Sequence, residues 1–189
     1  MYASPYQPEF FDWAFPYKRD EDRYNHGSIV ADDVRSIVEH EVPDFPDVDV
    51  MMTHGPPQYH LDRSEHPLGR VGEDKHVGCP HLFRALARAK PLLHCFGHIH
   101  EGYGAELVQW RKSGTSGTQA DVLRTTRLDG RAAGQIDTSM SQYLDFSKTG
   151  DHVISHGEET LLVNAAIMTR LYKPEHAPWI VDLDLPGAR

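Results

Sequence analysis

The sequence has little cysteine, no long apolar run and no surplus of positive charge. Cys79 and Cys95 are the two cysteines in 189 residues, so no disulfide framework is expected, and a reducing compartment, the cytoplasm, is the predicted location. A run of about 18 apolar residues, which a membrane-spanning helix needs, does not occur, and the first residues lack the pattern of a signal peptide. The formal net charge of −9 at pH 7 argues against a nucleic-acid-binding surface, because such a surface needs a basic patch.

Histidine, by contrast, is abundant. The chain has 13 histidines, and most of them lie between His54 and His100. Because imidazole binds transition-metal ions, this concentration favours metal chemistry over chance. A length of 189 residues is enough for one domain with its own core, so we expect a single domain over residues 1–189.

Two of the histidines follow an apolar run with the length of a buried strand. Residues 91–96 (PLLHCF) are bounded by proline and by Gly97, which is typical of a strand covered on both faces. Gly97 would permit a tight exit from the sheet. If the chain stays extended, His98 and His100 point to the same side, because side chains alternate along a strand. A His-x-His pattern is weak by itself, and two surface histidines in a loop are the alternative.

A second strand brings another histidine to its carboxyl end. Residues 48–53 (VDVMMT) lead into His54, and Pro56 and Pro57 cannot continue a sheet ladder. Between the two strands, residues 78–90 have apolar side chains on one helical face, with proline in the first turn and basic residues at the end. This strand–helix–strand order predicts a parallel pair whose carboxyl ends meet at one edge of the sheet, where the sites of α/β proteins lie.

Four segments together resemble the calcineurin-like metallophosphoesterases, and within them the subgroup called metallophosphoesterase-domain-containing proteins. They are residues 52–57 (MTHGPP), 61–62 (LD), 78–82 (GCPHL) and 96–104 (FGHIHEGYG). The order and spacing of His-Gly-Pro-Pro and Gly-His-x-His make the resemblance fairly specific. It implies an α/β fold in which two packed sheets, a β-sandwich, are flanked by helices and hold a two-metal site at the strand ends.

The resemblance also identifies motifs that this chain lacks. The N-terminal half of the family carries Asp-x-His, Gly-Asp-x-x-Asp and Gly-Asn-His motifs, and none of the three occurs here. The chain therefore resembles the C-terminal half of such an enzyme: an incomplete metallophosphoesterase-type β-sandwich and a partial calcineurin-like phosphoesterase domain over residues 1–189. An incomplete gene model is one explanation, and an inactive remnant of the fold is another.

The resemblance implies metal-binding roles for three histidines. His54 and His98 would bind one divalent ion and His100 the other, with Mn, Fe or Zn as the metal. In the intact family two ions clamp the phosphoryl oxygens and generate the nucleophile. Three neutral imidazoles bring no negative charge to offset two dications, so at most one metal ion is expected here. Asp62 and Glu101 are the nearest candidate carboxylate substitutes.

The resulting functional prediction is a phosphoester hydrolase of the dinuclear, metal-dependent class, by resemblance. No catalytic residue is assigned in this chain, the substrate is unknown, and the chain alone is expected to be inactive. The alternative is a catalytically inactive remnant that binds one metal ion or a protein partner. Missing sheet neighbours would leave strand edges bare, so self-association through them is expected, whereas neither nucleic acid nor a membrane is an expected partner.

The remaining segments are predicted from composition and periodicity. Residues 10–15 should pack in the core, 18–25 should be a solvated loop and 31–40 should form a helix. Residues 109–150 hold many Gly, Ser and Thr, which predicts a long, flexible and disordered insertion. Strands should follow at 160–167 and 179–185.

Several polar residues near the motifs allow two interpretations. The loop residues that could approach a phosphoester, or could simply be exposed, are His60, His66, His76, Arg63 and Arg70. Cys79, at a helix start, could have a lowered thiol pKa or could be a small packed residue. His94 lies inside a predicted strand and should pack behind the site.

Overall fold

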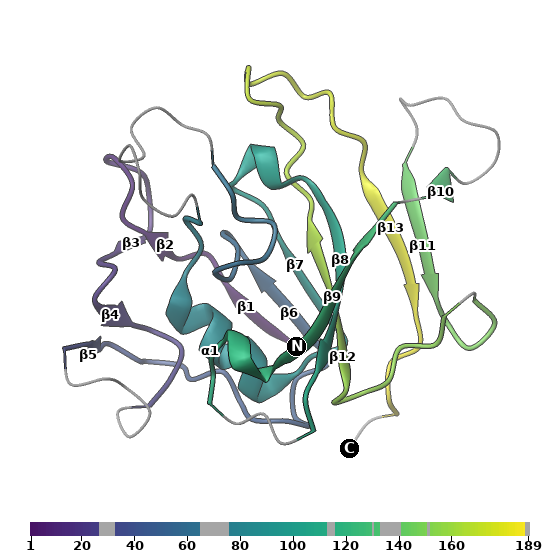
Figure 1. The fold of residues 1–189 in the computed structure, drawn as a ribbon. Helices are drawn as coiled ribbons and strands as arrows, with labels where there is room; N and C mark the ends of the chain where they lie inside the picture. Colours follow the sequence, from purple (N-terminus) through teal and green to yellow (C-terminus); the bar gives the residue numbers. More distant parts are fainter. Residues whose placement is uncertain are drawn as a thin grey trace.

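Strands form most of the regular secondary structure in this computed structural model, which describes residues 1–26, 33–64, 76–112, 116–129, 131–132, 141–150 and 152–187. One α-helix, α1 (Pro80–Ala89), and two short 3-10 helices, η1 (His100–Gly102) and η2 (Gln119–Asp121), lie among these residues (Figure 1). The strands are β1 (Tyr2–Ser4), β2 (Gln7–Pro8), β3 (Pro16–Tyr17), β4 (Glu21–Asp22), β5 (Arg35–Ser36), β6 (Val50–Thr53), β7 (Leu93–Phe96), β8 (Gly104–Trp110), β9 (Val122–Leu128), β10 (Arg131–Ala132), β11 (Gln142–Phe146), β12 (Glu159–Asn164) and β13 (Trp179–Leu183).

A six-stranded mixed sheet in the order β1-β6-β7-β12-β8-β9 is the centre of the fold (Figure 1). The first four strands are parallel, and β8 and β9 continue the sheet antiparallel. The parallel strands end at Ser4, Thr53, Phe96 and Asn164 respectively. Their carboxyl ends therefore meet at one edge of the sheet, as the strand–helix–strand pattern predicted.

The central sheet has a separate hydrophobic cluster on each face, because successive apolar side chains of its buried strands point to opposite faces. On β12, Leu162 belongs to the cluster with α1, whereas Leu161 and Val163 belong to the cluster with β11 and β13. A three-stranded sheet, β10-β11-β13, covers this second face (Figure 1). The described residues thus form three layers: helix and N-terminal segment, large sheet, small sheet. This agrees with the coarse α/β prediction, with one flanking α-helix in the described part of the chain.

Helix α1 forms where the sequence predicts it, since its apolar residues recur on one face and pack under the sheet. The Cys79 sulfur accepts the backbone N–H of Leu82 at 3.3 Å and so caps the first turn. Pro80 occupies the first turn, where its missing N–H costs nothing. Lys90, in the left-handed conformation with φ 42°, closes the helix by donating its N–H to Leu86 O at 2.8 Å.

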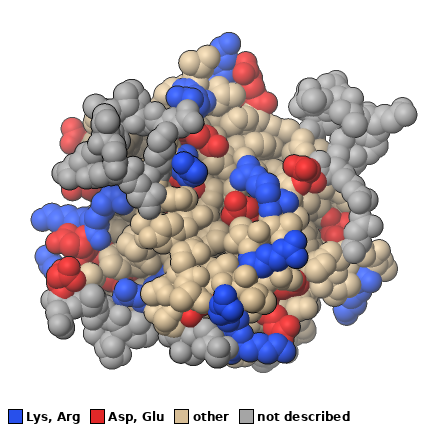
Figure 2. All heavy atoms as spheres, viewed as in Figure 1, with Lys and Arg blue, Asp and Glu red and all other residues tan. Residues whose placement is uncertain are grey.

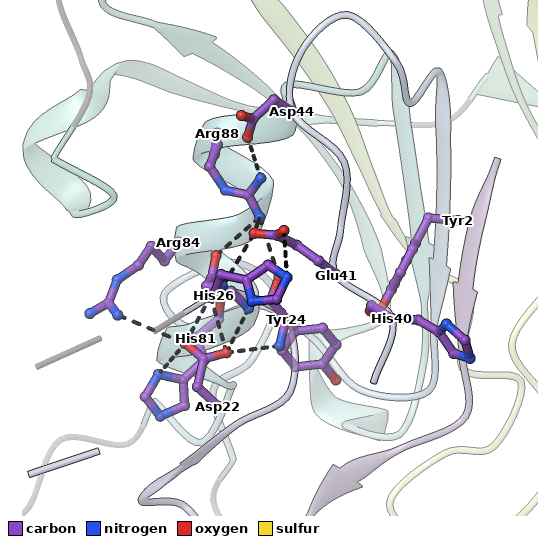
Figure 3. Close-up of polar contacts among 11 residues, drawn as sticks. Tyr2, Asp22, Tyr24, His26, His40, Glu41, Asp44, His81, Arg84 and Arg88 are labelled. Atoms are coloured by element: carbon purple, nitrogen blue, oxygen red, sulfur yellow. Dashed lines mark hydrogen bonds and ion pairs between the residues drawn. The ribbon is translucent and has the colours of Figure 1, made fainter. Parts of the chain in front are cut away.

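The predicted solvated loop at 18–25 is wrong, because its second half is buried against α1. Asp22 and Asn25 have no exposed surface, and Tyr24 is 1% exposed. Asp22 accepts the backbone N–H groups of Tyr24 and Asn25, and Asn25 donates to the carbonyl of His81. His81 and Arg84 of α1 lie beside the Asp22 carboxylate (Figure 3). The charged residue Asp22 is part of a buried polar network here. Composition alone cannot distinguish such a buried charged residue from one that is exposed to water.

Two other local predictions are wrong. The aromatic residues at 10–15 are not core: Phe11 is 59% exposed and Trp13 is 41% exposed. The described residues 33–40 contain no helix, and β5 pairs parallel with β4 there. The apolar residues of that stretch, Val34, Ile37 and Val38, are β-branched and suit a strand at least as well as a helix.

The described parts of residues 109–150 differ from the predicted disordered insertion. Within this stretch, β9 pairs with β8 at six positions and extends the large sheet, and β11 pairs with β13 in the small sheet. Residues 113–115, 130 and 133–140 lie outside the described residues. The polar composition reflects the outer position of β9, where Arg124 and Thr125 face solvent at the sheet edge.

On the face of the molecule seen in Figure 2, basic and acidic side chains are interspersed. Within the part of the chain that the structure describes, no helix has the length and apolar character needed to cross a bilayer.

Candidate metal centre

His54 and His98 meet at the carboxyl edge of the parallel strands. The nearest ring nitrogens, His54 Nε2 and His98 Nδ1, are 3.1 Å apart. The backbone fixes this approach from both sides, because His54 donates its N–H to Ser4 O at 3.2 Å and accepts the N–H of Gly97 at 3.0 Å. The two histidines of separate strands are thus brought together, as the sequence predicts.

The separation of these two nitrogens matches that of two ligands on one ion. Two imidazole nitrogens bound to a tetrahedral zinc ion at about 2.05 Å lie about 3.3 Å from each other. The distance of 3.1 Å between His54 Nε2 and His98 Nδ1 is close to that value. A metal ion bound to both nitrogens would take the place of the shared hydrogen, and because it would lie off the line between the nitrogens, both rings would turn toward it.

Burial keeps the imidazoles in the form that binds metals. The pKa of His98 is lowered to about 4, mainly by burial and to a smaller extent by the nearby imidazoles of His54 and His100. Burial also lowers the pKa of His54. These shifts favour the neutral form of both rings, which a metal ligand requires, and in the contact between them one of the two facing nitrogens carries the hydrogen that an ion would displace.

The chain holds His98 in an uncommon conformation. Its φ of 69° lies in the left-handed region, which costs a residue with a side chain of order 1 kcal/mol or more. Gly97, predicted as the residue that allows the turn, has no positive φ, and a Cβ there would meet its nearest neighbour, Ala166, at 3.8 Å. The strain at this strand end is therefore borne by the histidine that meets His54.

His100 lies beside the pair and faces a different partner. Its Nδ1 donates to Thr169 O at 3.1 Å, which leaves Nε2 as the lone-pair nitrogen, and its ring packs edge-on against Tyr172. A backbone carbonyl in this role fixes the tautomer of many metal-binding histidines. An open cleft of about 400 Å³ adjoins His100 and is also lined by Tyr103, Arg170 and His176.

His94 packs behind the pair, as predicted. Its side chain is fully buried, and burial, followed by repulsion from His60, lowers its pKa to about 3. Thr53 donates its hydroxyl to Gly55 O and therefore accepts from His94 Nε2, with both contacts at 2.8 Å. This chain of contacts supports the turn that carries His54.

Both candidate carboxylates have other partners. Asp62 is buried and accepts the N–H groups of Tyr59 and Gly78, each at 2.9 Å, and the Nδ1–H of His76 at 2.5 Å. Glu101 lies 3.8 Å from the guanidinium of Arg170. Among the residues that the structure describes, no three His, Cys, Asp or Glu side chains are grouped so that they could hold a metal ion. Within the described residues, the pair of imidazoles His54 and His98 is therefore the set of donors that could hold one ion.

The other loop histidines differ from the exposed-loop interpretation. His60 is 2% exposed, stacks on Phe83 and contacts Glu106 through Nδ1 at 3.2 Å. His76 is half-buried on Asp62. Arg63 is exposed and joins His76 in an isolated β-bridge, whereas His66 and Arg70 lie outside the described residues.

Cys79 is a packed residue and not an activated thiol. It is buried, and burial raises its pKa. In a Cys95→Ser variant, we expect Cys79 to react with Ellman's reagent at least about 100-fold more slowly in the native protein than after unfolding in urea. The matched Cys79→Ser variant reports Cys95, which is only partly buried. Labelling of native Cys79 at the rate of the unfolded thiol would contradict this assignment.

Two residues that the sequence did not single out hold the site loops together. Asn164, at the end of β12, donates Nδ2 to Leu61 O at 3.1 Å and to Ile99 O at 2.9 Å. Gly102 lies against the same loop, and a Cβ on it would be 1.8 Å from Leu61 O. An asparagine at the end of an apolar strand was the available signal, but its partners are 103 and 65 residues away.

Comparison with curated proteins gives relatives of two kinds. The chain is 34% identical over 105 residues to human metallophosphoesterase domain-containing protein 1, a match that covers 55% of this chain and 26% of that protein. A UPF0046 protein of Caenorhabditis elegans is 30% identical over 105 residues and is covered to 21% of its length. The chain is also 38% identical over 112 residues to a probable rhamnogalacturonate lyase C of Emericella nidulans, of which the match covers 8%.

The chain thus spans about a quarter or less of the length of these curated relatives. No family model matches the sequence. No solved structure matches it either. The resemblance seen in the histidine motifs is nevertheless confirmed by the similarity to the first two relatives. Over about 55% of its length this chain is similar to the metallophosphoesterase-domain-containing proteins, which supports the resemblance to the C-terminal region of that subgroup.

Proposed function

We propose that this chain carries the imidazole half of the metal centre of a metal-dependent phosphoester hydrolase. In this proposal the chain alone binds one divalent ion, Zn, Mn or Fe, through His54 Nε2 and His98 Nδ1. The observation that supports it most directly is the 3.1 Å separation of these two nitrogens, which belong to neutral rings at the end of neighbouring parallel strands. The relationship to the metallophosphoesterase subgroup supplies the reaction class.

A divalent ion at this position would act as a Lewis acid on a phosphoryl oxygen. The chain's own residues would hold it in place. His54 is fixed by two backbone hydrogen bonds, and His98 is held between backbone contacts of its neighbours, so little ordering is left to occur on binding. His100 would present Nε2 toward an adjacent ion or substrate, since its Nδ1–H is bound to Thr169 O. The cleft beside His100 would accommodate the organic part of a phosphoester.

Hydrolysis by the isolated chain is not part of the proposal. A dinuclear centre needs carboxylates to balance two dications, and the described residues bring none to the pair. The alternative function, a catalytically inactive remnant that binds one metal ion or a protein partner, rests on the same donor set. The exposed aromatic rings of Phe10 and Trp13 near His98 and the outer strands β1 and β9 are the surfaces where a partner or a second copy would bind.

Metal uptake tests the proposal directly. We expect the chain to bind about one equivalent of Zn²⁺ or Mn²⁺ in isothermal titration calorimetry. His54→Ala and His98→Ala should each weaken binding at least about tenfold, because each removes half of the donor pair. The matched control is His26→Ala, since His26 is exposed and pairs with Glu41, away from the site.

Two outcomes separate the candidate functions. Affinity that is equal in wild type, His54→Ala and His98→Ala would disprove the metal site. Turnover of p-nitrophenyl phosphate at the rate of buffer is expected for the chain alone, whereas metal-dependent turnover abolished by His98→Ala would show that the pair is sufficient for hydrolysis and would overturn the inactive alternative.

A further inference from the structure

We propose that Asn164 is the positioning residue that holds His98 against His54. This inference deepens the proposed metal centre, and it rests on that function only for its affinity measurement. Asn164 touches neither ring. It acts through the backbone of the two loops that carry them, which begin at His54 and at Gly97.

The side chain of Asn164 joins both loops at once. It is fully buried, and its two N–H groups bind the carbonyls of Leu61, in the His54 loop, and of Ile99, in the His98 loop, at 3.1 and 2.9 Å. Its Oδ1 accepts the N–H of Ala166 at 3.1 Å. Two carbonyls on one side and an N–H on the other fix the orientation of the amide, and both donors are used.

The contact to Ile99 falls directly next to the strained residue. His98 has φ 69°, and it persists there because both neighbours are tied down. Gly97 donates its N–H to His54 O at 3.0 Å, and Ile99 donates its N–H to Gly97 O at 2.8 Å. The carbonyl of Ile99 is then held by Asn164, so the backbone on either side of His98 cannot rotate independently.

Loss of this clamp has a specific consequence for the site. Without the amide donors, the buried carbonyl of Leu61 loses its partner, and the carbonyl of Ile99 keeps only the N–H of Gly102 at 3.1 Å. The 97–102 loop is then no longer tied to the His54 loop and can move toward water. The same movement releases His98 from the left-handed region, because relaxation there is downhill. The ring nitrogen would then leave the 3.1 Å contact with His54 while the strands stay paired.

A nuclear magnetic resonance measurement on the metal-free chain tests this without any assumption about function. The ring centroids of His54 and His98 lie 4.8 Å apart, so a nuclear Overhauser effect between their C–H protons is expected in the wild type. Asn164→Asp, which keeps the shape but removes both donors, should lose it. Asn164→Ser, which keeps one donor, should weaken it and serves if the aspartate variant does not fold.

The matched control is Asn25→Ser. Asn25 is also fully buried and donates from Nδ2 to Asp22 and to His81 O, but it lies in the network beside α1. The Asn25→Ser variant should lose stability and keep the contact between the rings of His54 and His98. If Asn164 had a purely structural role, the Asn164 variants would give the same result. Unchanged ring contacts in a folded Asn164 variant would therefore overturn the proposal.

Metal affinity gives the second measurement. Asn164→Asp or Asn164→Ser should weaken Zn²⁺ binding about 10- to 100-fold, the usual effect of removing a residue that orients a ligand. Asn25→Ser should leave it within about twofold. If the wild type binds no metal but the ring contact depends on Asn164 as expected, the metal proposal fails and the positioning role stands.

Discussion

Replacing Gly102 by alanine is expected to lower the free energy of unfolding by more than about 3 kcal/mol. A Cβ at this position would lie 1.8 Å from Leu61 O, 2.6 Å from Leu61 C and 2.8 Å from Asn164 Nδ2. Two of the three atoms are backbone, and the third is the buried amide that joins the two site loops. None can yield without displacing a loop, so the overlap cannot be relieved by a change of rotamer.

Urea unfolding followed by circular dichroism measures this loss, and Gly97→Ala is the control. Gly97 is five residues away in the same loop, yet a Cβ there would meet its nearest neighbours at 3.8 Å, which is ordinary contact. Because Gly97 has no positive φ, its alanine variant should stay within about 1 kcal/mol of wild type. Equal losses in the two variants would show that the loops do not approach each other as described.

The parts of the fold that the sequence predicted are those set by short-range signals. Residues 48–53 and 91–96 contain β6 and β7, since apolar runs closed by proline or glycine have few alternatives. Helix α1 has its predicted proline start and apolar face. From the parallel pair alone, one can infer that His54 and His98 lie at the same edge.

The missed features depend on distant contacts. Asn164 binds carbonyls 103 and 65 residues away, so nothing in its neighbourhood reveals that it joins two loops. His60 was interpreted as a loop histidine, and its burial against Phe83 depends on α1 packing over it. The aromatic residues at 10–15 were placed in the core by their size, but large apolar side chains also occur at surfaces.

The conformation of His98 shows a limit of another kind. Glycine next to a histidine motif suggests that the glycine provides the turn, yet the positive φ belongs to His98. The preference of glycine for such conformations is a tendency, and the hydrogen bonds on either side of His98 outweigh it. Strain at a candidate ligand can therefore be found only in the structure.

Removal of the Asp22 carboxylate is expected to have an effect as large as that of Gly102→Ala, far from the metal site. Asp22 is fully buried on β4 and accepts three N–H groups: the backbone N–H of Tyr24 at 2.8 Å, that of Asn25 at 3.0 Å, and the Asn25 amide. His81 and Arg84 of α1 approach the same carboxylate to 3.5 and 3.9 Å. It thus fastens the N-terminal segment to the helix.

Asp22→Ala should lower the free energy of unfolding by about 3–5 kcal/mol, because it leaves the buried N–H groups of Tyr24 and Asn25 without their acceptor and removes the carboxylate that faces His81 and Arg84. Asp20→Ala is the control: its side chain is exposed, and the substitution keeps the backbone carbonyl that accepts the N–H of Arg35 at 2.8 Å. That variant should stay within about 0.5 kcal/mol of wild type in urea unfolding. Asp22→Asn distinguishes the two causes, since it keeps an acceptor for the N–H groups and removes the charge that faces His81 and Arg84. If Asp22→Asn loses about as much stability as Asp22→Ala, the stabilisation comes from the charge, and if it loses almost none, the stabilisation comes from the hydrogen bonds. A loss below about 1 kcal/mol in Asp22→Ala would contradict the network.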